Sequence, residues 1–572
     1  MVTGFGRAGA PMAAMALMVA VSSAPGQSAA PPAARRPPML KGHLIQNLAS
    51  DLPPQPASGA VATGLARAYG GSPISVTTYH YDTLRTGWNP AETDLTVANV
   101  VKGRFGLIAS LPVDGLVLAQ PLLAAGVEMA DDSEHDVLIV ATEHNSVYAF
   151  DARSYARLWQ VSLGPSQSSL DVGCADVQPE YGISSTPVIA ADEGAGRRVL
   201  YVVSATETAG PTFQTQLHAL DLATGQDLRP PAVIAPSGSL STGGTVAFSP
   251  QNQWNRAGLA WNAGSIYVGV GGHCDNDAAL TTGWLLRYDS ALTPLSAFQS
   301  IRQPTAYWLG SVWMSGVAPA IDASGNVFVA TGNGAYSGAT SQNWSMSVIR
   351  LPADLSAVTS SFTPAGYAQL NAQDFDLGAG GVLLLPPVAG QTAPPLAVIE
   401  GKWPQLYLLN QNSLGGLSAG DGGALQAQRA GKAKSNFGLW GAPTFFNGSS
   451  GPMVFLQTYG DLLKGYSVSA GAAPALTLAL QGTTPAGKGG SLSVVSSNGA
   501  APGTGVVWVL RRTVPPALEA YDAARLGAPI WRATAGAWPS GPTGQIILTP
   551  MEANGRVYVG SSKVVDVFGL LK

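Results

Sequence analysis

The stretch 310–350, GSVWMSGVAPAIDASGNVFVATGNGAYSGATSQNWSMSVIR, contains one copy of a unit that recurs along the chain. Its pattern predicts a short apolar strand at 314–321, a turn at 322–326 and a β-branched strand at 327–331. A Gly-Asn-Gly loop follows, and 346–351 is expected to be a third strand. Because short turns join these strands, the stretch predicts an antiparallel meander rather than a βαβ unit.

Further copies of this unit are spread over most of the chain, so that there are eight in all. Each has a strand, a turn with Gly or Asn, a V-[YF]-V strand, a loop and an [AY]-[FLY]-D strand, and several continue into a strand with Trp. The copies lie at residues 137–159, 199–225, 265–290, 326–355, 396–416, 453–471, 506–531 and 556–571. Repeats that cannot bury both of their faces alone stack into a solenoid or close into a propeller.

The two ends of the chain favour the closed ring. The eighth copy stops at Lys572 without an outer strand, whereas FGLIASLPVDG (105–115) resembles the outer strand LWQVSLG (158–164). An N-terminal strand that completes the last blade closes the ring and removes two exposed sheet edges. We therefore predict an all-β fold, a single eight-bladed β-propeller of four-stranded antiparallel blades over residues 76–572, with residues 79–100 lying across the ring.

Composition and charge favour the same fold class. Among 572 residues, 46% are hydrophobic, only 11% are charged, and there are 69 Gly and 42 Pro, which suits many tight turns and few amphipathic helices. A net charge of -4 without a basic run argues against a nucleic-acid surface. The sequence contains no H-E-x-x-H, P-loop or C-x-x-C-H motif, which argues against the activities that depend on them.

The N-terminal region is typical of an exported protein. Residues 1–24 are expected to be a signal peptide, with Arg7 before an apolar run at 12–21, and residues 25–75 an Ala/Pro-rich flexible leader. We expect a periplasmic or secreted monomer without a transmembrane segment, because no later run of apolar residues is long enough to span a bilayer. In such a protein Cys174 and Cys274 are candidates for a disulfide, but the sequence does not show whether they approach each other.

A propeller brings particular loops to one end of its channel. The loops that join the second strand of a blade to the third, called B–C loops here, share a face with the loops that join one blade to the next. The residues expected in B–C loops are Glu143, His144, Asn145, Glu207, His273, Cys274, Asp275, Asn333 and Lys402. Cys174 and Asp376 are expected in blade-to-blade loops. All of them should meet at one mouth of the channel, which is a common place for a ligand and makes a Cys174–Cys274 bridge sterically reasonable.

Four segments resemble the quinoprotein alcohol dehydrogenases. GSVWMSGVAPAID followed by VFVATGNGAYS resembles that family's Trp strand and T-G-N-G/P-x-P-W motif, and QNWSMSVIR resembles its N-K-W-T-M-T-I strand. DFDLGAGGVLLL resembles its W-D-Y-A-G segment, and IEGKWPQLYLLNQ resembles its [KR]-x-G-x-x-Y-x-L-D-R segment. Secreted bacterial proteins with pyrroloquinoline-quinone-like repeats are a nearer match.

The resemblance implies a site for pyrroloquinoline quinone and Ca²⁺. In the family a planar quinone lies between a Trp and a disulfide, with Ca²⁺, an Asp base and a Lys or Arg beside it. By motif, Trp313 would be the stacking floor, Asp376 the base and Lys402 the cation at the quinone oxygen. The implied Ca²⁺ ligands are Asn333, Asp376 and Asp275, and Glu143 joins the cofactor-binding set. Such a site would oxidise an alcohol or a sugar.

The chain also departs from the family pattern, and these departures support a second interpretation. The adjacent Cys-Cys pair is missing, and the loop at 334–337 reads Gly-Ala-Tyr-Ser. The alternative is a non-catalytic propeller whose mouth binds a protein or glycan partner, with Asn333 as a left-handed turn residue between two glycines and Lys402 in solvent. Asp374 and Asp376 would face opposite ways on a strand, which argues against paired-acid glycoside chemistry. The enzyme interpretation requires Asp376 and Asn333 to approach one ion above Trp313, with Trp403 outside the channel.

Overall fold

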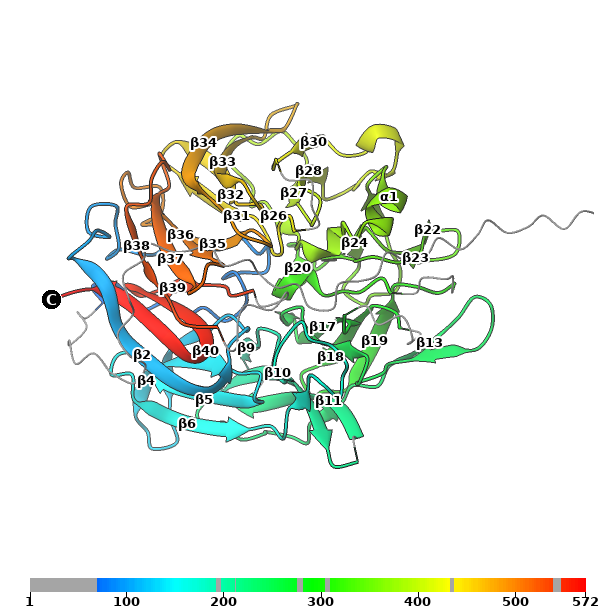
Figure 1. Ribbon diagram of the computed structural model, residues 1–572, viewed down its shortest axis with the longest axis horizontal. Coiled ribbons are helices and arrows are strands. Elements are labelled where there is room, and N and C mark those ends of the chain that lie inside the picture. Colours follow the sequence, from blue (N-terminus) through cyan, green and yellow to red (C-terminus); the bar gives the residue numbers. More distant parts are fainter. Residues whose placement is uncertain are drawn as a thin grey trace, which may run out of the picture. The chain divides into compact units, whose positions relative to one another are not determined.

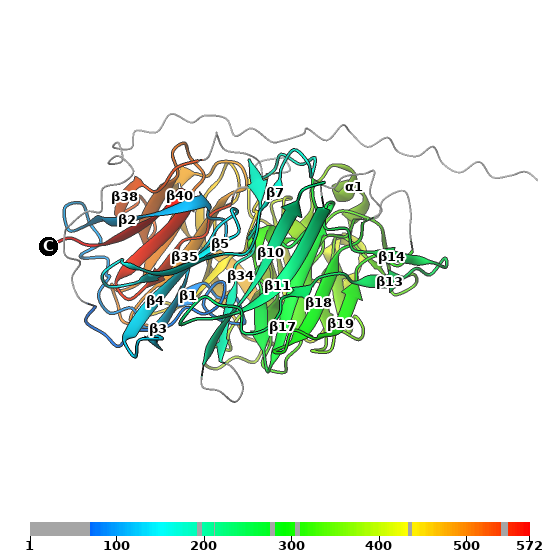
Figure 2. The ribbon, with the colours of Figure 1, turned by 90° about the horizontal axis from the view of Figure 1, so that it is seen from below.

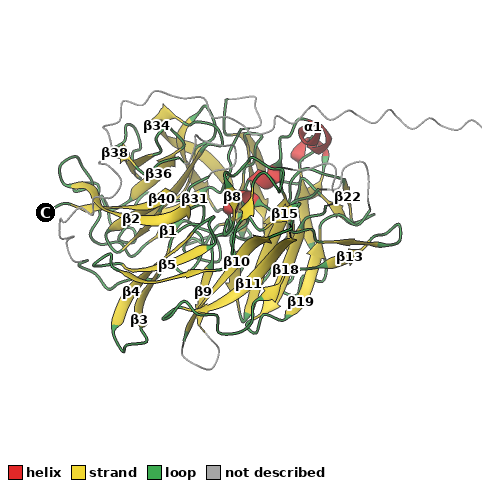
Figure 3. Ribbon diagram, turned by 60° about the horizontal axis from the view of Figure 1, so that its bottom comes forward, coloured by secondary structure: helices red, strands yellow, loops and turns green. Residues whose placement is uncertain are grey.

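The computed structural model describes residues 69–191, 197–210, 212–274, 281–303, 309–432, 437–538 and 547–572. Over these residues the chain forms an all-β, eight-bladed propeller, as predicted (Figure 1). Figure 3 shows that strands dominate and that helical turns are few and short. The expected signal peptide, most of the expected leader, and Asp275 lie outside the described residues. Within the described part, no helix is long and apolar enough to cross a membrane.

In blades 1 to 7 the strands follow the chain from the innermost position to the outermost. In blades 1 to 3 they are β3 (Leu122–Glu128), β4 (Glu134–Ala141), β5 (Ser146–Asp151), β6 (Arg157–Ser162); β9 (Val188–Ala191), β10 (Arg198–Thr208), β11 (Thr212–Asp221), β12 (Ala232–Val233); β16 (Ala260–Asn262), β17 (Ser265–Gly272), β18 (Trp284–Asp289) and β19 (Pro294–Gln299). Figure 2 shows the strands of blades 2 and 3 running side by side.

Blades 4 to 7 repeat this arrangement. Their strands are β20 (Ala320–Ile321), β21 (Val327–Ala330), β24 (Val348–Leu351), β25 (Ser360–Thr363); β26 (Leu383–Leu384), β27 (Leu396–Ile399), β28 (Gln405–Asn410), β30 (Gln426–Arg429); β31 (Thr444–Gly448), β32 (Gly451–Leu456), β33 (Leu462–Ser469), β34 (Ala475–Pro485); β35 (Ser491–Ser496), β36 (Val506–Arg511), β37 (Ala517–Asp522) and β38 (Trp531–Thr534).

The remaining short elements lie in connections or beside the blades. They are β1 (Trp88–Asn89), β7 (Gln167–Ser168), β8 (Glu180–Tyr181), β13 (Ser237–Ser239), β14 (Thr245–Ala247), β15 (Gln253–Trp254), β22 (Tyr336–Gly338), β23 (Asn343–Trp344), β29 (Gly416–Leu417), α1 (Tyr367–Ala372) and the 3-10 turns η1 (Met314–Gly316), η2 (Leu377–Ala379) and η3 (Ala419–Asp421).

The eighth blade joins the two ends of the described chain. It contains β39 (Met551–Ala553), β40 (Arg556–Leu570) and the N-terminal β2 (Phe105–Leu116). The first part of β40 pairs with β39 and the second part pairs antiparallel with β2, with Lys563 at a positive φ of 59° between them. In Figure 1 the blue β2 lies along the red β40. The prediction that an N-terminal strand closes the ring is therefore confirmed.

Apolar side chains of neighbouring blades pack face to face. Between blades 1 and 2, for example, Ile139 and Val147 belong to one buried cluster with Leu200 and Val202. Similar clusters occupy the other interfaces of the ring. Burying the faces of consecutive sheets in this way supplies the main stabilisation of a repeat fold.

Residues 76–92, called the strap here, close one end of the channel. Backbone hydrogen bonds join the strap to the innermost strands of many blades; they run from Val76 to Leu123, Ile189 to Thr77, Ile321 to Thr83, Leu384 to Leu84, and Phe445 to Thr86. In addition, β1 pairs parallel to β35. These contacts lie where the innermost strands approach the turns that lead into the second strands. The strap therefore runs across the innermost strands of the ring, as expected for residues 79–92, whereas Val97 of the expected lead-in bonds to Gly503 instead.

The structure corrects one local prediction. The stretch 314–321 was expected to be a strand, but it begins with the turn η1 and only Ala320–Ile321 pair in a sheet. Met314 and Ser315 have positive φ values of 41° and 51°, and a Cβ on Gly316 would lie 2.3 Å from the Arg256 guanidinium. The Arg256 side chain thus packs against this turn and leaves no room for a side chain at Gly316. The two following strands, β21 and β24, lie where the sequence predicts them.

Candidate functional site

A disulfide ties together two loops at the mouth of the channel. Cys174 lies in the connection from blade 1 to blade 2, and Cys274 follows β17 in the B–C loop of blade 3. They form a disulfide with a Cα–Cα distance of 5.6 Å. The candidate bridge is confirmed, and so is the expectation that these two kinds of loop share one face. Disulfides of this kind are typical of proteins outside the cytoplasm.

A buried lysine lies between two aspartates at this mouth. Lys402, in the B–C loop of blade 5, is only 6% exposed. Its Nζ lies 2.7 Å from Asp374 Oδ1 and 3.5 Å from Asp376 Oδ2. Lys402 is thus an ion-paired, buried group, and its interpretation as a solvated residue is wrong.

The approach of both aspartates to one lysine contradicts the expectation that they face opposite ways. That expectation assumed a strand, but Asp374 and Asp376 lie in the connection between α1 and η2. Asp374 has a positive φ of 58°, so the chain turns sharply between the two residues. The Asp376 side chain makes no capping hydrogen bond to η2. Both carboxylates are therefore available to the lysine.

Trp313 completes the group around Asp376. Its indole Nε1 donates a hydrogen bond to Asp376 Oδ2 at 3.2 Å, and Lys402 Nζ lies 5.8 Å from the centre of the ring, within the range of a cation–π contact. Gly332 leaves room for this contact, because a Cβ there would lie 3.1 Å from Asp376 Oδ1. The structure thus brings three of the predicted site residues together.

Burial shifts the pKa of Asp376 upward. The side chain is enclosed by protein, and this desolvation raises its pKa above the ordinary value, against the opposing charge of Lys402. Its Oδ1 has no hydrogen-bond partner. A carboxyl group with a raised pKa and one unused oxygen is a reasonable candidate for proton transfer.

Asn333 is close to this group but bonds to the other aspartate. Its Nδ2 donates to Asp374 Oδ1 at 2.7 Å, while its Oδ1 has no partner. Asn333 therefore contacts the Lys402 ion pairs through Asp374, whereas Asp376 takes part in them directly. Asn333 has no positive φ, so the interpretation of this residue as a left-handed turn residue does not hold.

Trp403 packs against Phe375, the residue between the two aspartates. Its ring lies 5.1 Å from Phe375, and the Arg429 guanidinium lies 4.7 Å over it. Arg429 belongs to β30, the outermost strand of blade 5. The indole is thus packed between Phe375 and the outermost strand of blade 5.

Glu143 is held deeper, beside the connection from blade 1 to blade 2. Its Oε2 accepts hydrogen bonds from the Gly182 amide at 2.7 Å and the Ser184 hydroxyl at 2.9 Å, while Oε1 has no partner. Burial raises the pKa of Glu143 to about 7, so the carboxyl group is part protonated near neutral pH.

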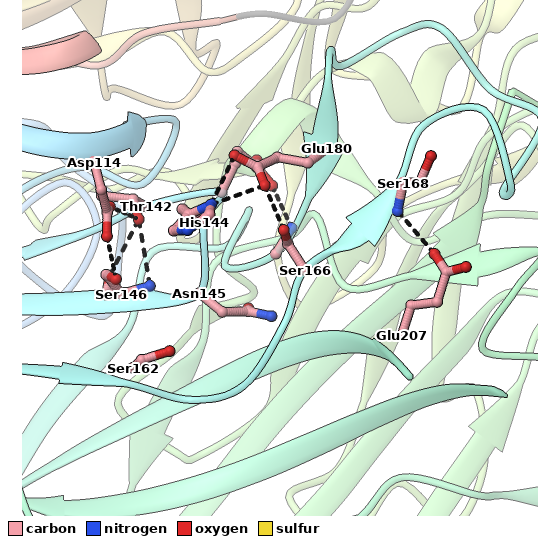
Figure 4. A network of polar contacts seen from close by, with 12 residues as sticks. Asp114, Thr142, His144, Asn145, Ser146, Ser162, Ser166, Ser168, Glu180 and Glu207 are labelled. Carbon is pink, nitrogen blue, oxygen red and sulfur yellow. Dashed lines mark hydrogen bonds and ion pairs between the residues drawn. The ribbon is translucent and has the colours of Figure 1, made fainter. Parts of the chain in front are cut away.

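Residues neighbouring Glu143 line a separate surface groove on the rim. His144 Nδ1 pairs with Glu180 at 3.0 Å, and Glu207 accepts a hydrogen bond from the Ser168 amide at 2.9 Å (Figure 4). Glu207 lies within β10 rather than in a loop, which corrects its predicted place. The groove has a volume of about 570 Å³ and is lined by Ser166, Ser168, Asp171, Pro179, Glu180, Glu207, Thr208, Ala209 and Gly210.

Two charged residues of the channel were missed from the sequence. Arg256 is buried and donates hydrogen bonds to the carbonyl oxygens of Ser184 at 3.1 Å and Ile547 at 3.4 Å. Asp176 lies two residues after Cys174, and burial raises its pKa to about 6, opposed by Lys402. Neither belongs to a motif, and only Asp176, two residues after Cys174, lies near a loop residue identified from the sequence.

The buried oxygens without a hydrogen-bond partner in the described part of these loops include Asp376 Oδ1, Asn333 Oδ1 and Glu143 Oε1. Carboxylate and amide oxygens are the ligands that a hard cation such as Ca²⁺ prefers. Together with the Trp313 indole and the Lys402 ammonium, they provide groups for a flat polar ligand, a cation and a proton transfer.

Solved structures share this architecture. The quinohemoprotein alcohol dehydrogenase from Comamonas testosteroni matches with a TM-score of 0.55 at 15% identity, over 86% of this chain and 80% of that chain. A europium-containing methanol dehydrogenase matches with a TM-score of 0.56 at 14% identity, over 87% and 98%. A quinohemoprotein alcohol dehydrogenase from Pseudomonas putida HK5 matches with a TM-score of 0.56 at 14% identity, over 87% and 80%.

These matches confirm the family resemblance at the level of the fold. No protein-family model matches the chain, and neither does any curated protein. Fold alone does not determine activity, so function has to be argued from the site.

Proposed function

We propose that the protein is a periplasmic or secreted oxidoreductase of the quinoprotein type, which oxidises an alcohol or a sugar at the mouth of the propeller channel. The observation that supports it most is the arrangement of Asp376. This carboxyl group is buried, has a raised pKa, and lies between the Trp313 indole and the Lys402 ammonium. The sequence motifs, which occur in the same order as in the quinoprotein alcohol dehydrogenases, also point to Trp313, Asp376 and Lys402.

The donor set fits the cofactors that the fold family implies. The unpartnered oxygens of Asn333 and Glu143 are hard ligands suited to Ca²⁺, which leaves Asp376 Oδ1 for the proton transfer. Trp313 would support the quinone ring, and Lys402 would contact its carbonyl oxygen. When bound, pyrroloquinoline quinone supplies the two-electron acceptor that the protein's own side chains lack.

The residues of this chain would then prepare the substrate. Asp376 accepts the hydroxyl proton of the alcohol through Oδ1, which is the carboxylate oxygen that no other group uses. Lys402 and the Trp313 N–H both face the other oxygen, and they hold the carboxylate in place while its charge changes. Burial keeps water away from the proton transfer.

Activity with loaded protein tests this proposal. The full chain would be incubated with pyrroloquinoline quinone and CaCl₂, and the reduction of an artificial electron acceptor would be followed with a panel of primary alcohols and aldoses. Loss of a general base typically lowers the reaction rate by about 10²- to 10⁴-fold, so Asp376→Asn should lower kcat by at least about 100-fold. Asp354→Asn is the matched control, because Asp354 is exposed on the connection after β24.

A chain that turns over none of these substrates, or an Asp376→Asn variant as active as the control, would overturn the proposal. The alternative would then be a non-catalytic propeller that binds a protein or glycan partner. The groove on the rim, with its carboxylate and hydroxyl lining, favours that second function as a place for such a partner.

A further inference from the structure

One part of the ring carries an excess of positive charge. From residue 422 to residue 518 the sequence has a single acidic residue, Asp461. This stretch covers the outermost strand of blade 5, the whole of blade 6 and the first strands of blade 7, drawn in yellow to orange in Figure 1. Its basic residues are Arg429, Lys432, Lys434, Lys464, Lys488, Arg511 and Arg512. Since the whole chain has a net charge of -4, this region has the opposite sign to the rest.

Two of these basic residues are used in ion pairs inside the blades. Lys464 pairs with Asp461 at 2.9 Å, and Arg511 pairs with Glu519 at 3.2 Å. All four side chains are buried, so these pairs support the sheets of blades 6 and 7. The other basic residues in the described part of the stretch, called the basic rim here, are Arg429, Lys432, Lys488 and Arg512.

The basic rim lies at the mouth of the channel. Arg429 ends β30, and Lys432 follows it in the connection from blade 5 to blade 6. Lys488 lies in the connection from blade 6 to blade 7, and Arg512 follows β36 in the B–C loop of blade 7. Because such connections and the B–C loops share one face of the ring, these charges meet at the same mouth as the candidate site.

Hydrogen bonds join the rim directly to the backbone of the candidate site. The Gly438 amide donates to the Lys402 carbonyl at 3.0 Å, and the Gly489 amide donates to the Phe437 carbonyl at 2.8 Å. Lys488 Nζ lies 4.5 Å over the Phe437 ring. The ammonium group of Lys488 is therefore held beside the segment that supports Lys402.

Aromatic rings hold the other cations of the rim. The Arg512 guanidinium lies 5.0 Å over the Trp440 ring, and its Nη1 donates to the Lys488 carbonyl at 2.8 Å. The Arg429 guanidinium lies over Trp403 in the B–C loop of blade 5. A ring attracts a cation through its quadrupole and does not neutralise the charge. The rings thus fix the positions of the cations and leave the rim positive.

The two sides of the mouth differ in charge. Burial lowers the pKa of Arg512 to about 9, and burial followed by the charge of Arg512 lowers the pKa of Lys488. Cations held this close repel each other, and an anion placed beside them relieves the repulsion. The groove at blades 1 and 2 is instead lined by Asp171, Glu180 and Glu207. An anion that reaches the mouth is therefore steered toward blades 5 to 7.

We propose that the basic rim binds a carboxylate group of the substrate, so that the protein acts on a sugar acid in preference to a neutral alcohol or sugar. The inference rests on the proposed function for the oxidation itself and adds the class of substrate. Lys488 and Arg429 are then specificity-determining residues. A carboxylate held by the rim leaves the hydroxyl groups of the same molecule to face the neighbouring Lys402 and Asp376.

A matched pair of sugars tests this preference. D-Galactose and D-galacturonate share one ring and differ at C6, which is a hydroxymethyl group in the first and a carboxylate in the second. The full chain would be titrated calorimetrically with each sugar, both alone and loaded with pyrroloquinoline quinone and CaCl₂. We expect galacturonate to bind about tenfold more tightly at about 20 mM NaCl, and the difference to shrink at about 500 mM NaCl because salt screens exposed charges.

Charge variants locate the preference on the rim. An ion pair near the surface typically changes an equilibrium constant by up to about fivefold, so Lys488→Gln should lower the preference for galacturonate by about threefold. Adding Arg429→Gln should lower it by about tenfold in total. Lys488→Arg should retain the preference, because it keeps the charge. Lys102→Gln is the control, since Lys102 is exposed in the segment before β2.

Each outcome of these titrations decides between the alternatives. Equal affinities for the two sugars, or a preference that survives the loss of both rim charges, would overturn the inference. The quinone also bears carboxylates, so variants that weaken only its binding would assign the rim to the cofactor and contradict the inference as well. Oxidation of the sugars is followed separately. A rim-dependent preference without turnover keeps the anion site and refutes the proposed function, whereas turnover without a preference does the reverse.

Discussion

Arg85 is the residue whose replacement best tests how the strap is held. It is fully buried, and burial lowers the pKa of its guanidinium to about 10, so the side chain is charged at neutral pH. Nε and Nη2 donate to the Pro319 carbonyl at 3.0 and 2.7 Å. Nη1 donates to Thr78 Oγ1, Tyr79 O and Asp82 O at 2.8, 3.0 and 2.9 Å.

Arg85→Met keeps much of the volume and removes every one of these donors. The buried carbonyl of Pro319 then loses both of its hydrogen bonds from Arg85, and a buried acceptor without a partner costs about 1–3 kcal/mol. Adding the lost bonds within the strap, we expect the free energy of unfolding to fall by about 3–5 kcal/mol. For roughly 500 ordered residues the unfolding entropy is about 1 kcal/mol per degree, so Tm should fall by about 3–5 °C.

Differential scanning calorimetry at pH 7 measures this change, with Arg104→Met as the control because Arg104 is exposed just before β2. Limited proteolysis gives a second readout, since a loosened strap should be cut faster than the ring. If Arg85→Met melts within about 1 °C of the control and its strap is cut no faster, the strap is not held by this residue and the reasoning is wrong.

Three further changes probe the site and its supports. Gly332→Ala places a methyl group against Asp376, so ligand affinity should fall by about tenfold in a calorimetric titration while Tm stays near that of the parent. Cys174→Ser with Cys274→Ser opens a crosslink that spans 100 residues, and chemical unfolding should show a loss of about 3–5 kcal/mol. Burial raises the pKa of Glu400 to about 8, so its carboxyl group is protonated in the folded protein but ionised in the unfolded chain above about pH 4.5. The free energy of unfolding of the parent, compared with that of Glu400→Gln, should therefore decline as pH rises from about 4.5 to 8, by up to about 4 kcal/mol.

For each of these three changes, a specific result would contradict the expectation. Gly366→Ala is the control for the glycine change, because nothing lies near its Cβ position, and equal affinities of both variants would show that Gly332 provides no needed space. An unchanged unfolding free energy in the serine double variant would mean that the bridge does not constrain the unfolded chain. Parallel pH profiles of the parent and Glu400→Gln would show that Glu400 does not titrate between the two states.

The ring could be predicted because its signals are local and repeated. Each blade carries the same order of turn, β-branched strand and Asp-ended strand, and β2 could be recognised as an outer strand without a blade of its own. The prediction for 314–321 failed for a long-range reason. An apolar run suggests a strand, but the side chain of Arg256, distant in sequence, takes the space beside Gly316.

The site was harder to predict because its contacts depend on how loops fold. Trp313, Asp376 and Lys402 were found through motifs, but the orientation of Asn333 toward Asp374 depends on a single left-handed turn. The sequence does not predict the contact of Asp374 with Lys402, because this segment was expected to be a strand and the chain instead turns at Asp374. Arg256 and Asp176 stand outside any motif, and their importance follows only from burial and from neighbours contributed by other blades.

The central claim is that the mouth of the channel is a quinone and calcium site. The most direct test is a calorimetric titration of the purified protein with pyrroloquinoline quinone, with and without Ca²⁺, repeated on Asn333→Ala. We predict binding with a Kd of about 1 μM or tighter that requires Ca²⁺ and is lost in the variant. An absence of binding at high micromolar quinone, or binding that neither Ca²⁺ nor Asn333 affects, would contradict the account.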